Sequence, residues 1–377
     1  MKVIIFPRYD STQASTRVRV LQYLPFLKEA GIDFEVFPII NFDGISGRIN
    51  SLAFWKSRLK SYYRVGRRLF KEKGKESLIH IHSELFPFMP FWLEYGYLLL
   101  LGKKKYIIEL DDAWFHRYNA NNSILIRLFL SKKIDLLMRH SVLVIAGNQY
   151  IADRAKLAGA KCIEIIPTVV DVEKYMNYLL SLKKIKSIYN KKVRSSLKEA
   201  INYKSKPVIG WIGTPSTTKF LLTIKNIITL MNDNGIANFV AIGADSYQLR
   251  GLPVTVIPWN EENELETLSQ FDIGIMPLSD SLFERGKCGY KLIQYMACGL
   301  PVVASPVGVN SSIVVHNETG FLASKNDEWL KYLTLLCSDL ELRNRLGQKG
   351  LIRVNELYSL RVTSPKYVSL LKNMSSY

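Results

Sequence analysis

Short apolar runs and stretches with helical spacing alternate along the first half of the chain. The run KVIIF at 2–6 ends at a proline and predicts a buried strand, and after a polar loop the spacing over 17–31 predicts a helix that ends at Gly31. Strand–loop–helix–strand units of this kind are typical of a parallel sheet with right-handed crossovers. Further strands are predicted at 33–40, 77–82, 105–110, 142–147 and 164–168.

The second half repeats the pattern. A strand is predicted at 207–213 and a helix at 219–233, and further strands at 237–243, 254–258, 272–278 and 301–305. The chain is therefore expected to be an α/β protein with two doubly wound, Rossmann-like lobes. The predicted parts are a first lobe at 1–172, a lysine-rich inserted or hinge segment with helical character at 173–206, a second lobe at 207–355, and a terminal helix at 356–377 that returns to the first lobe.

Size and composition agree with two domains. The chain has 377 residues, of which 48% are hydrophobic, enough to form two cores. Its four cysteines form no CxxC pair and no cluster with histidine at metal spacing, and the short apolar run at the start is no signal peptide, so a reducing cytoplasm is expected. The most apolar stretch, 86–102, contains Glu94 and two prolines and is too short to span a bilayer, so it is predicted to be a loop followed by a core helix.

A formal net charge of +18 attracts anionic partners: nucleic acid, anionic lipid or phosphorylated substrates. The stretch 52–75 combines many lysines and arginines with aromatic and aliphatic residues near helical spacing. This pattern is typical of a helix that lies on an anionic membrane surface, and the basic segment 173–206 extends the charge. A helix packed on its own sheet would show a similar apolar stripe.

One loop, 279–291, has the composition of an anion site. It follows a predicted strand and leads into a helix that is expected to begin near Gly289. Backbone N–H groups at a helix start favour an anion, and Lys287 and Lys291 add positive charge there. The alternative is a solvated lysine pair beside a turn.

The surrounding sequence resembles a known family. The stretch 271–323 contains the successive segments KLIQYMACG, GLPVVAS and NETGFLA, in the order found at the nucleotide-sugar site of family 4 (group 1) glycosyltransferases of the GT-B fold, particularly members that assemble polysaccharide and lipopolysaccharide. The resemblance implies two lobes that face each other across a cleft and a second lobe that binds a nucleoside diphosphate sugar. It also implies transfer with retention of anomeric configuration, without a metal or other cofactor.

The sequence departs from the family at its two-glutamate motif. Gln294 stands where the second glutamate would contact the nucleotide ribose, and an amide can still bond a hydroxyl, without charge assistance. The first glutamate would fall at Gly286, and the nearest acid is Glu284. Lys291 matches the lysine of one variant of the motif.

A second loop, 213–219, follows a second-lobe strand and is predicted to help hold the diphosphate with hydroxyls, backbone amides and one lysine. The alternative is an ordinary helix cap built from Ser216 or Thr217. The base is expected near Ile257–Trp259. The predicted donor-binding residues are Gly213, Thr214, Ser216, Lys219, Trp259, Gly289, Tyr290, Lys291 and Gln294.

First-lobe loops that follow strands supply the remaining candidates. Asp111 and Asp112 end a strand, where one of them could orient an acceptor hydroxyl, and arginines in 11–20 could bind a phosphorylated acceptor or the donor's diphosphate. A capped helix start with outward arginines is the alternative. The predicted catalytic residues are Asp111, Asp112, Lys287 and Glu284, and the predicted acceptor-binding residues are Ser15, Arg17, Arg19, Glu84 and His116.

The sequence thus predicts a retaining, metal-independent glycosyltransferase, peripheral at the inner face of the membrane, that acts on a lipid-linked or polysaccharide acceptor in cell-surface glycan synthesis. Three alternatives stay open: a sugar-nucleotide binder without activity, a sugar-nucleotide epimerase of the same fold, and a basic nucleic-acid-binding protein. The last is disfavoured because the basic residues belong to no recognised nucleic-acid-binding module.

Overall fold

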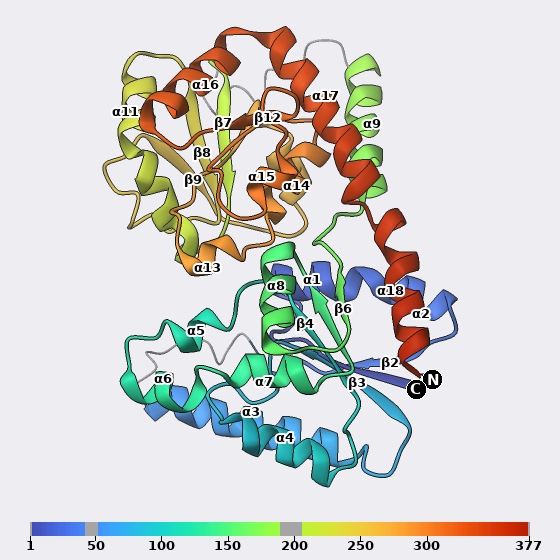
Figure 1. Cartoon of the computed structure of the whole chain (residues 1–377). Helices are drawn as coiled ribbons and strands as arrows, with labels where there is room; N and C mark the ends of the chain where they lie inside the picture. Colours follow the sequence, from blue (N-terminus) through green and yellow to red (C-terminus); the bar gives the residue numbers. More distant parts are fainter. Residues whose placement is uncertain (1, 42–51, 189–205, 376–377) are drawn as a thin grey trace. The chain divides into compact units, whose positions relative to one another are not determined.

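The computed structural model (Figure 1) describes residues 2–41, 52–188 and 206–375, so residues 189–205 of the predicted basic segment lie outside the described residues. The chain forms two compact units. Unit 1 comprises Met1–Val169, Ser281–Cys288 and Leu360–Tyr377, and unit 2 comprises Val170–Asp280 and Gly289–Ser359. Each unit contains a parallel sheet that is six strands wide among the described residues, with helices around it, which confirms the predicted α/β fold.

The sheet of unit 1 has the strand order β2-β1-β3-β4-β5-β6. Its strands are continuous apolar runs because helices cover the sheet, and the side chains from Val3 to Phe6 are fully buried. The order reverses between β1 and β3, and ligands of such sheets bind beyond the carboxyl ends of the strands at this point. The elements of unit 1 are β1 (Lys2–Phe6), α1 (Ala14–Arg19), the 3-10 helix η1 (Leu21–Tyr23), α2 (Leu24–Glu29), β2 (Asp33–Val36), α3 (Leu52–Phe70), β3 (Ser77–His82), α4 (Phe91–Leu100), β4 (Tyr106–Leu110), α5 (His116–Asn119), α6 (Ile124–Leu130), α7 (Lys133–His140), β5 (Leu143–Ala146), α8 (Gln149–Ala158), β6 (Ile163–Ile165), α13 (Leu282–Arg285) and α18 (Leu360–Ser375).

The sheet of unit 2 has the order β12-β11-β10-β7-β8-β9, which reverses between β10 and β7. The loop 213–219 follows β7, and the loop 279–291 comes shortly after the end of β10. Both predicted phosphate loops therefore lie at the reversal in strand order. The elements of unit 2 are α9 (Val172–Ile188), β7 (Val208–Ile212), the 3-10 helix η3 (Pro215–Ile224), α11 (Lys225–Asp233), β8 (Asn238–Ile242), β9 (Val254–Ile257), α12 (Glu264–Leu268), β10 (Ile273–Met276), α14 (Tyr290–Ala297), β11 (Val302–Ala304), α15 (Asn310–Ile313), β12 (Gly320–Leu322), α16 (Asn326–Ser338) and α17 (Leu340–Leu357).

Two predicted helices differ from the structure: one starts as a 3-10 helix, and the other is divided into three short helices. The helix predicted at 219–233 starts as η3, because threonine hydroxyls bond to carbonyls three residues earlier, as Thr223 does to Phe220 at 2.6 Å, and compete with regular helical bonds. The helix predicted at 17–31 divides into α1, η1 and α2, and Pro25 lies in the first turn of α2.

The prediction of a core helix within 86–102 was wrong in part. A helix, α4, does follow a loop, but Trp92 and Leu100 are 65% and 70% exposed. None of the helices in the described parts of the chain combines the length and hydropathy needed to cross a bilayer.

A glycine on α17 sets the distance between two elements of unit 2. A Cβ on Gly347 would lie 2.0 Å from the carbonyl oxygen of Gly299, which follows α14. A Cβ on Gly350, one turn later, would meet the side chain of Met296 at 3.3 Å. The first contact is with rigid backbone and the second with a flexible side chain.

We expect Gly347→Ala to lower the free energy of unfolding by about 1–3 kcal/mol or more, because α17 must move away from α14. Gly350→Ala is the matched control and should stay within about 1 kcal/mol of the parent, since alanine favours a helix and methionine can adjust. Chemical denaturation measures both variants. Equal stability of the two variants would contradict this account of the packing.

Candidate functional site

In unit 2, a tryptophan lies between the loop after β7 and helix α14. The Nζ atom of Lys291 lies 5.5 Å from the centroid of the Trp211 ring. Gly213 lies against the same ring, where a Cβ would come within 2.2 Å of it. Trp211 is therefore a rigid platform that brings two predicted donor-binding residues, Gly213 and Lys291, to the same place.

The loops after β7, β8 and β9 also touch. Gly243, which follows β8, has φ of +69°, and a Cβ there would lie 2.5 Å from the carbonyl oxygen of Gly213 and 3.1 Å from Cβ of Trp259. This close approach requires glycine at position 243. It adds Trp259 to the cluster that contains Gly213 and Lys291.

A carboxylate that sequence reasoning missed completes the cluster. Glu264 accepts hydrogen bonds from Nε1 of Trp259 at 2.7 Å and from Nε2 of Gln294 at 2.8 Å. Gln294, predicted to replace a ribose-binding glutamate, is only 2% exposed and orients Glu264. A signal was present, because the acidic stretch WNEENE at 259–264 directly follows a strand.

The start of α14 has the backbone form that the sequence predicts. Gly289 has φ of +67°, and a Cβ there would lie 2.3 Å from Ile313. The first turn contains Lys291 and no acidic residue. The N-terminal end of a helix dipole is positive, and Lys291 adds further positive charge there. This turn is therefore suited to an anion.

The loop 213–219 forms a helix cap with Thr214, not Ser216 or Thr217, at the N-cap position, and its phosphate role stays a prediction. Thr214 and Thr217 form a capping box at the start of η3, so a helix cap is present. The hydroxyls of Thr214 and Ser216 lie 3.0 Å apart, both residues are exposed, and so is Lys219. Exposed hydroxyls and a lysine at the sheet reversal remain suited to phosphate oxygens.

In unit 1, Asp111 is held in a fixed orientation at the carboxyl end of β4. Its carboxylate accepts hydrogen bonds from the hydroxyl of Ser15, from the backbone N–H of Asp112 at 3.0 Å and from Nε1 of Trp114 at 3.2 Å. Both aspartates are half-buried. The predicted residues Ser15 and Asp111 thus meet.

The segment Ser281–Cys288 packs on unit 1. The side-chain amide of Asn148 donates to the carbonyls of Gly286 at 2.9 Å and Lys287 at 3.3 Å, and a Cβ on Gly286 would lie 2.3 Å from Cβ of Ala113. Glu284 is 8% exposed and accepts from the hydroxyl of Ser281. All four predicted catalytic residues and all five predicted acceptor-binding residues belong to unit 1, and all nine predicted donor-binding residues belong to unit 2.

Three of the five predicted acceptor-binding residues, Arg19, His116 and Glu84, have side-chain partners on other elements of unit 1. Arg19 is 1% exposed, and its Nε lies 2.6 Å from Glu109. The ring nitrogens of His116 lie 2.9 Å from Asn119 Oδ1 and 2.8 Å from Tyr150 Oη, and burial lowers the pKa of this histidine. The burial of Arg19 does not support its prediction as an acceptor contact.

Glu84, the third of these residues, is 1% exposed and lies in the loop after β3. It contacts Lys133 at 2.7 Å, Arg8 at 3.0 Å and the hydroxyl of Tyr118. Burial opposes the ionised form, but Lys133 and Arg8 outweigh it and lower the pKa of Glu84 to about 2. Glu84 therefore anchors cations rather than contacting an acceptor directly. Arg17, by contrast, is half-buried, and its guanidinium donates to the carbonyls of Ser11 and Thr12.

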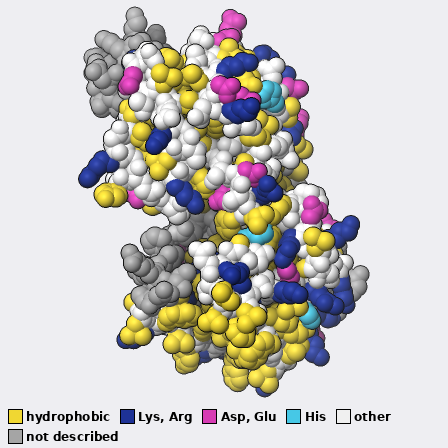
Figure 2. Space-filling model, turned by 60° about the vertical axis from the view of Figure 1, so that its left-hand side comes forward, with side chains coloured by type: hydrophobic (Ala, Val, Ile, Leu, Met, Phe, Trp, Pro, Cys, Tyr) yellow, Lys and Arg dark blue, Asp and Glu magenta, His cyan; other side chains and the backbone are white. Residues whose placement is uncertain are grey.

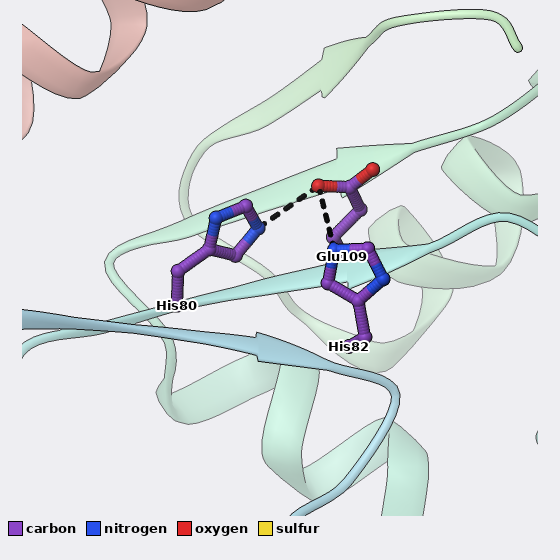
Figure 3. Close-up of side chains that lie close together, drawn as sticks. All are labelled: His80, His82 and Glu109. Carbon is purple, nitrogen blue, oxygen red and sulfur yellow. Dashed lines mark ion pairs between the residues drawn. The ribbon is translucent and has the colours of Figure 1, made fainter. Parts of the chain in front are cut away.

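A buried group of two histidines and a carboxylate lies across β3 and β4 (Figure 3). The rings of His80 and His82, which share one face of β3, both point at Glu109, with their Nε2 atoms 2.9 Å and 3.4 Å from its Oε2. The three ligand atoms could surround a metal ion. However, Arg19 already neutralises Glu109, and a cation would lie beside that guanidinium, so this geometry favours a charge network over a metal site.

This network predicts a dependence of stability on pH. Burial lowers the pKa of His80, so the folded protein binds fewer protons than the unfolded chain below the ordinary histidine pKa of about 6.5. Stability therefore falls as the pH falls through this region, by up to about 1.4 kcal/mol per pH unit.

We expect His80→Gln to reduce this loss, because glutamine does not titrate. Denaturation at pH 8 and pH 5.5 measures it, and the exposed His140→Gln is the control. An unchanged loss in His80→Gln would refute the assignment.

Comparison with solved structures identifies the class of fold as GT-B. The chain is similar to HepE of Anabaena in complex with UDP and glucose, at 14% identity and a TM-score of 0.69, with 99% of this chain and 100% of that chain covered. It is similar to sucrose-phosphate synthase of Thermosynechococcus elongatus at 14% identity and a TM-score of 0.67, with 100% and 99% covered. It is also similar to α,α-trehalose 6-phosphate synthase of Burkholderia multivorans at 12% identity and a TM-score of 0.66, with 100% and 99% covered.

The family comparison covers the second half of the chain. Residues 206–339 match the family described as "Glycosyl transferases group 1". The chain thus has the GT-B fold, and its second half is similar to the group 1 glycosyltransferases, as the resemblance found in its sequence indicated. A search among curated protein sequences gives no significant match.

Proposed function

We propose that the protein transfers a sugar from a nucleoside diphosphate sugar to a lipid-linked or polysaccharide acceptor in cell-surface glycan synthesis, with retention of configuration and without a metal. The observation that carries the proposal is the cluster in unit 2 beyond β7, β8 and β9. There Trp211 and Gly213 link Lys291 to Trp259 and Glu264. Its position in the group 1 domain and the UDP named with HepE support a nucleotide sugar as the ligand.

The donor lobe has groups for each part of a nucleotide sugar. Lys219, Lys291 and the start of α14 would stabilise the leaving diphosphate. The carboxylate of Glu264 would bind the ribose hydroxyls, with Gln294 holding it in place. A site that expels water would also protect the donor from hydrolysis.

The acceptor would bind to unit 1. Asp111, held by Ser15 and Trp114, would orient the attacking hydroxyl, and a fixed carboxylate loses little entropy when it does so. Glu264 also weakens the alternative of a binder without activity, because it supplies the carboxylate that Gln294 lacks.

A hydrophobic face of unit 1 supports a peripheral position at the inner face of the membrane. Helices α3, α4 and α6 expose large apolar side chains, which gather in the lower part of Figure 2. Lysines and arginines of α3 and α6 are exposed with them, as at an anionic membrane surface. The exposed apolar residues are Leu52, Trp55, Leu59, Tyr63 and Phe70 of α3, Trp92, Leu93, Leu99 and Leu100 of α4, and Ile124, Leu125, Leu128 and Phe129 of α6.

A thermal-shift screen against UDP-, GDP-, dTDP- and ADP-sugars tests the donor site. One of them should stabilise the protein by roughly 2.7 kcal/mol at a hundred times its dissociation constant. With that donor, Lys291→Ala should lower kcat by about 10²–10³-fold, because a group that stabilises the leaving diphosphate is lost.

The exposed Lys331→Ala of α16 is the control and should retain full activity. Activity should also persist in EDTA. Full transferase activity in Lys291→Ala, or no stabilisation by any of the four donors, would count against the proposed function.

Vesicle sedimentation tests the hydrophobic face. Leu128→Asp should weaken binding to vesicles that contain phosphatidylglycerol about tenfold, because a buried leucine side chain is lost from the interface. Leu340→Asp, exposed on α17 of unit 2, should bind as the parent does. Equal loss in both variants, or none in Leu128→Asp, would remove this face as the membrane contact.

A further inference from the structure

Three arginines of unit 1 lie around a group of aromatic rings. The guanidinium carbon of Arg8 lies 4.0 Å from the ring centroid of Trp114, and that of Arg117 lies 5.9 Å from the same ring. Arg117 also lies 4.8 Å from the centroid of Phe88. The three, Arg8, Arg58 and Arg117, are called the arginine cluster below.

Arg58 joins the cluster from α3. Its guanidinium carbon lies 4.7 Å from the centroid of Phe54, and the Phe54 and Phe88 rings are 6.0 Å apart. Burial lowers the pKa of Arg58, and the charges of Arg8 and Arg117 lower it further. Like charges that affect one another in this way are close in space.

Some hydrogen-bond donors of the arginine cluster have no partner among the described residues. Arg58 is 4% exposed and Arg8 is 3% exposed, yet Nε and Nη1 of Arg58 and Nη2 of Arg8 are buried without a hydrogen-bond partner in the described structure. The rings cover the flat faces of the guanidiniums, which leaves their N–H edges for a ligand. Buried donors without partners reduce stability, so a ligand that satisfies them is expected.

The charges indicate a dianion. Four cationic side chains occur here, those of Lys133 and the arginine cluster, against the two carboxylates of Glu84 and Glu94. The excess of two positive charges matches a phosphate or diphosphate group better than a single carboxylate. Arginine forks are also suited to phosphate oxygens in geometry.

The position indicates the acceptor. Arg8 follows β1 and Arg117 follows β4, on either side of the reversal in strand order. The Trp114 ring, which contacts both guanidiniums, also donates a hydrogen bond from Nε1 to Asp111. A phosphate in the cluster would therefore lie close to the carboxylate that is proposed to orient the acceptor hydroxyl. On the same helix as Arg58, Trp55 and Leu59 are exposed within the hydrophobic face.

We propose that Arg8, Arg58 and Arg117 bind the phosphate or diphosphate group that joins an acceptor sugar to its lipid. This inference rests on the proposed function for its acceptor role, but the anion site itself does not. It replaces Arg17 and Arg19, predicted from the sequence, with three other arginines of the same lobe.

Binding of soluble phosphates tests the site. Inorganic pyrophosphate and farnesyl diphosphate should bind the full-length protein, followed by tryptophan fluorescence and calorimetry. Arg58→Gln and Arg117→Gln should each weaken this binding by about tenfold to a hundredfold, the effect of a lost charged hydrogen bond. The exposed Arg67→Gln on α3 is the matched control and should bind as the parent does.

The variants also separate a ligand site from a structural role. Arg58→Met should raise the melting temperature without ligand, because a buried unpaired charge is removed, and should abolish stabilisation by pyrophosphate. A structural arginine would instead lower the melting temperature on substitution. Arg8 is not a suitable variant, since its loss would leave Glu84 short of a partner.

Further ligands and variants distinguish the possible outcomes. If glucose 1-phosphate binds as tightly as farnesyl diphosphate, the lipid source is overturned and the phosphate site is supported. If pyrophosphate binding is lost in Lys291→Ala and kept in Arg58→Gln and Arg117→Gln, the site proposed here is overturned. If these arginine variants lose pyrophosphate while no nucleotide sugar binds the protein, the proposed function fails and the anion site stands.

Discussion

Two carboxylates buried in unit 1 are neutralised by arginines that follow β1, and the geometry of this lobe depends on these pairs. Glu84 holds Arg8, and Glu109 holds Arg19. A buried charge without a partner costs several kcal/mol, so the segment from Arg8 to Arg19 cannot move away from the sheet without a large penalty. Ser15 lies on this segment, and its bond to Asp111 therefore starts from a fixed position.

The strands could be predicted from the sequence, but the buried ion pairs of this lobe could not. Apolar runs such as 2–6 and 207–213 predicted the strands, because burial on both faces of a parallel sheet leaves a continuous apolar pattern. The resemblance in 271–323 predicted the fold. Whether an arginine such as Arg19 points into the interior or toward a ligand depends on a distant partner, Glu109, which no local pattern reveals.

The candidate donor site was predictable in its loops but not in its network. Gly213, Lys291 and Gln294 were identified because they follow strands or match a motif. Glu264 was missed because its role depends on a contact with Gln294, thirty residues further along the chain. The substitution of glutamine for glutamate looked like a lost charge in the sequence. In three dimensions, the charge is present on a neighbouring element.

Neither unit is a continuous stretch of the chain, since unit 1 includes Ser281–Cys288, which interrupts unit 2, and Leu360–Tyr377, which follows it. Helix α18 supplies Tyr367 beside His80 and Thr363 beside Tyr23, so the first lobe is completed only after residues 360–375 have been synthesised. A ribosome that has made the first half has not made a finished lobe. For the same reason, a single genetic crossover near residue 170 could not exchange one donor-binding half for another without also replacing part of the acceptor lobe.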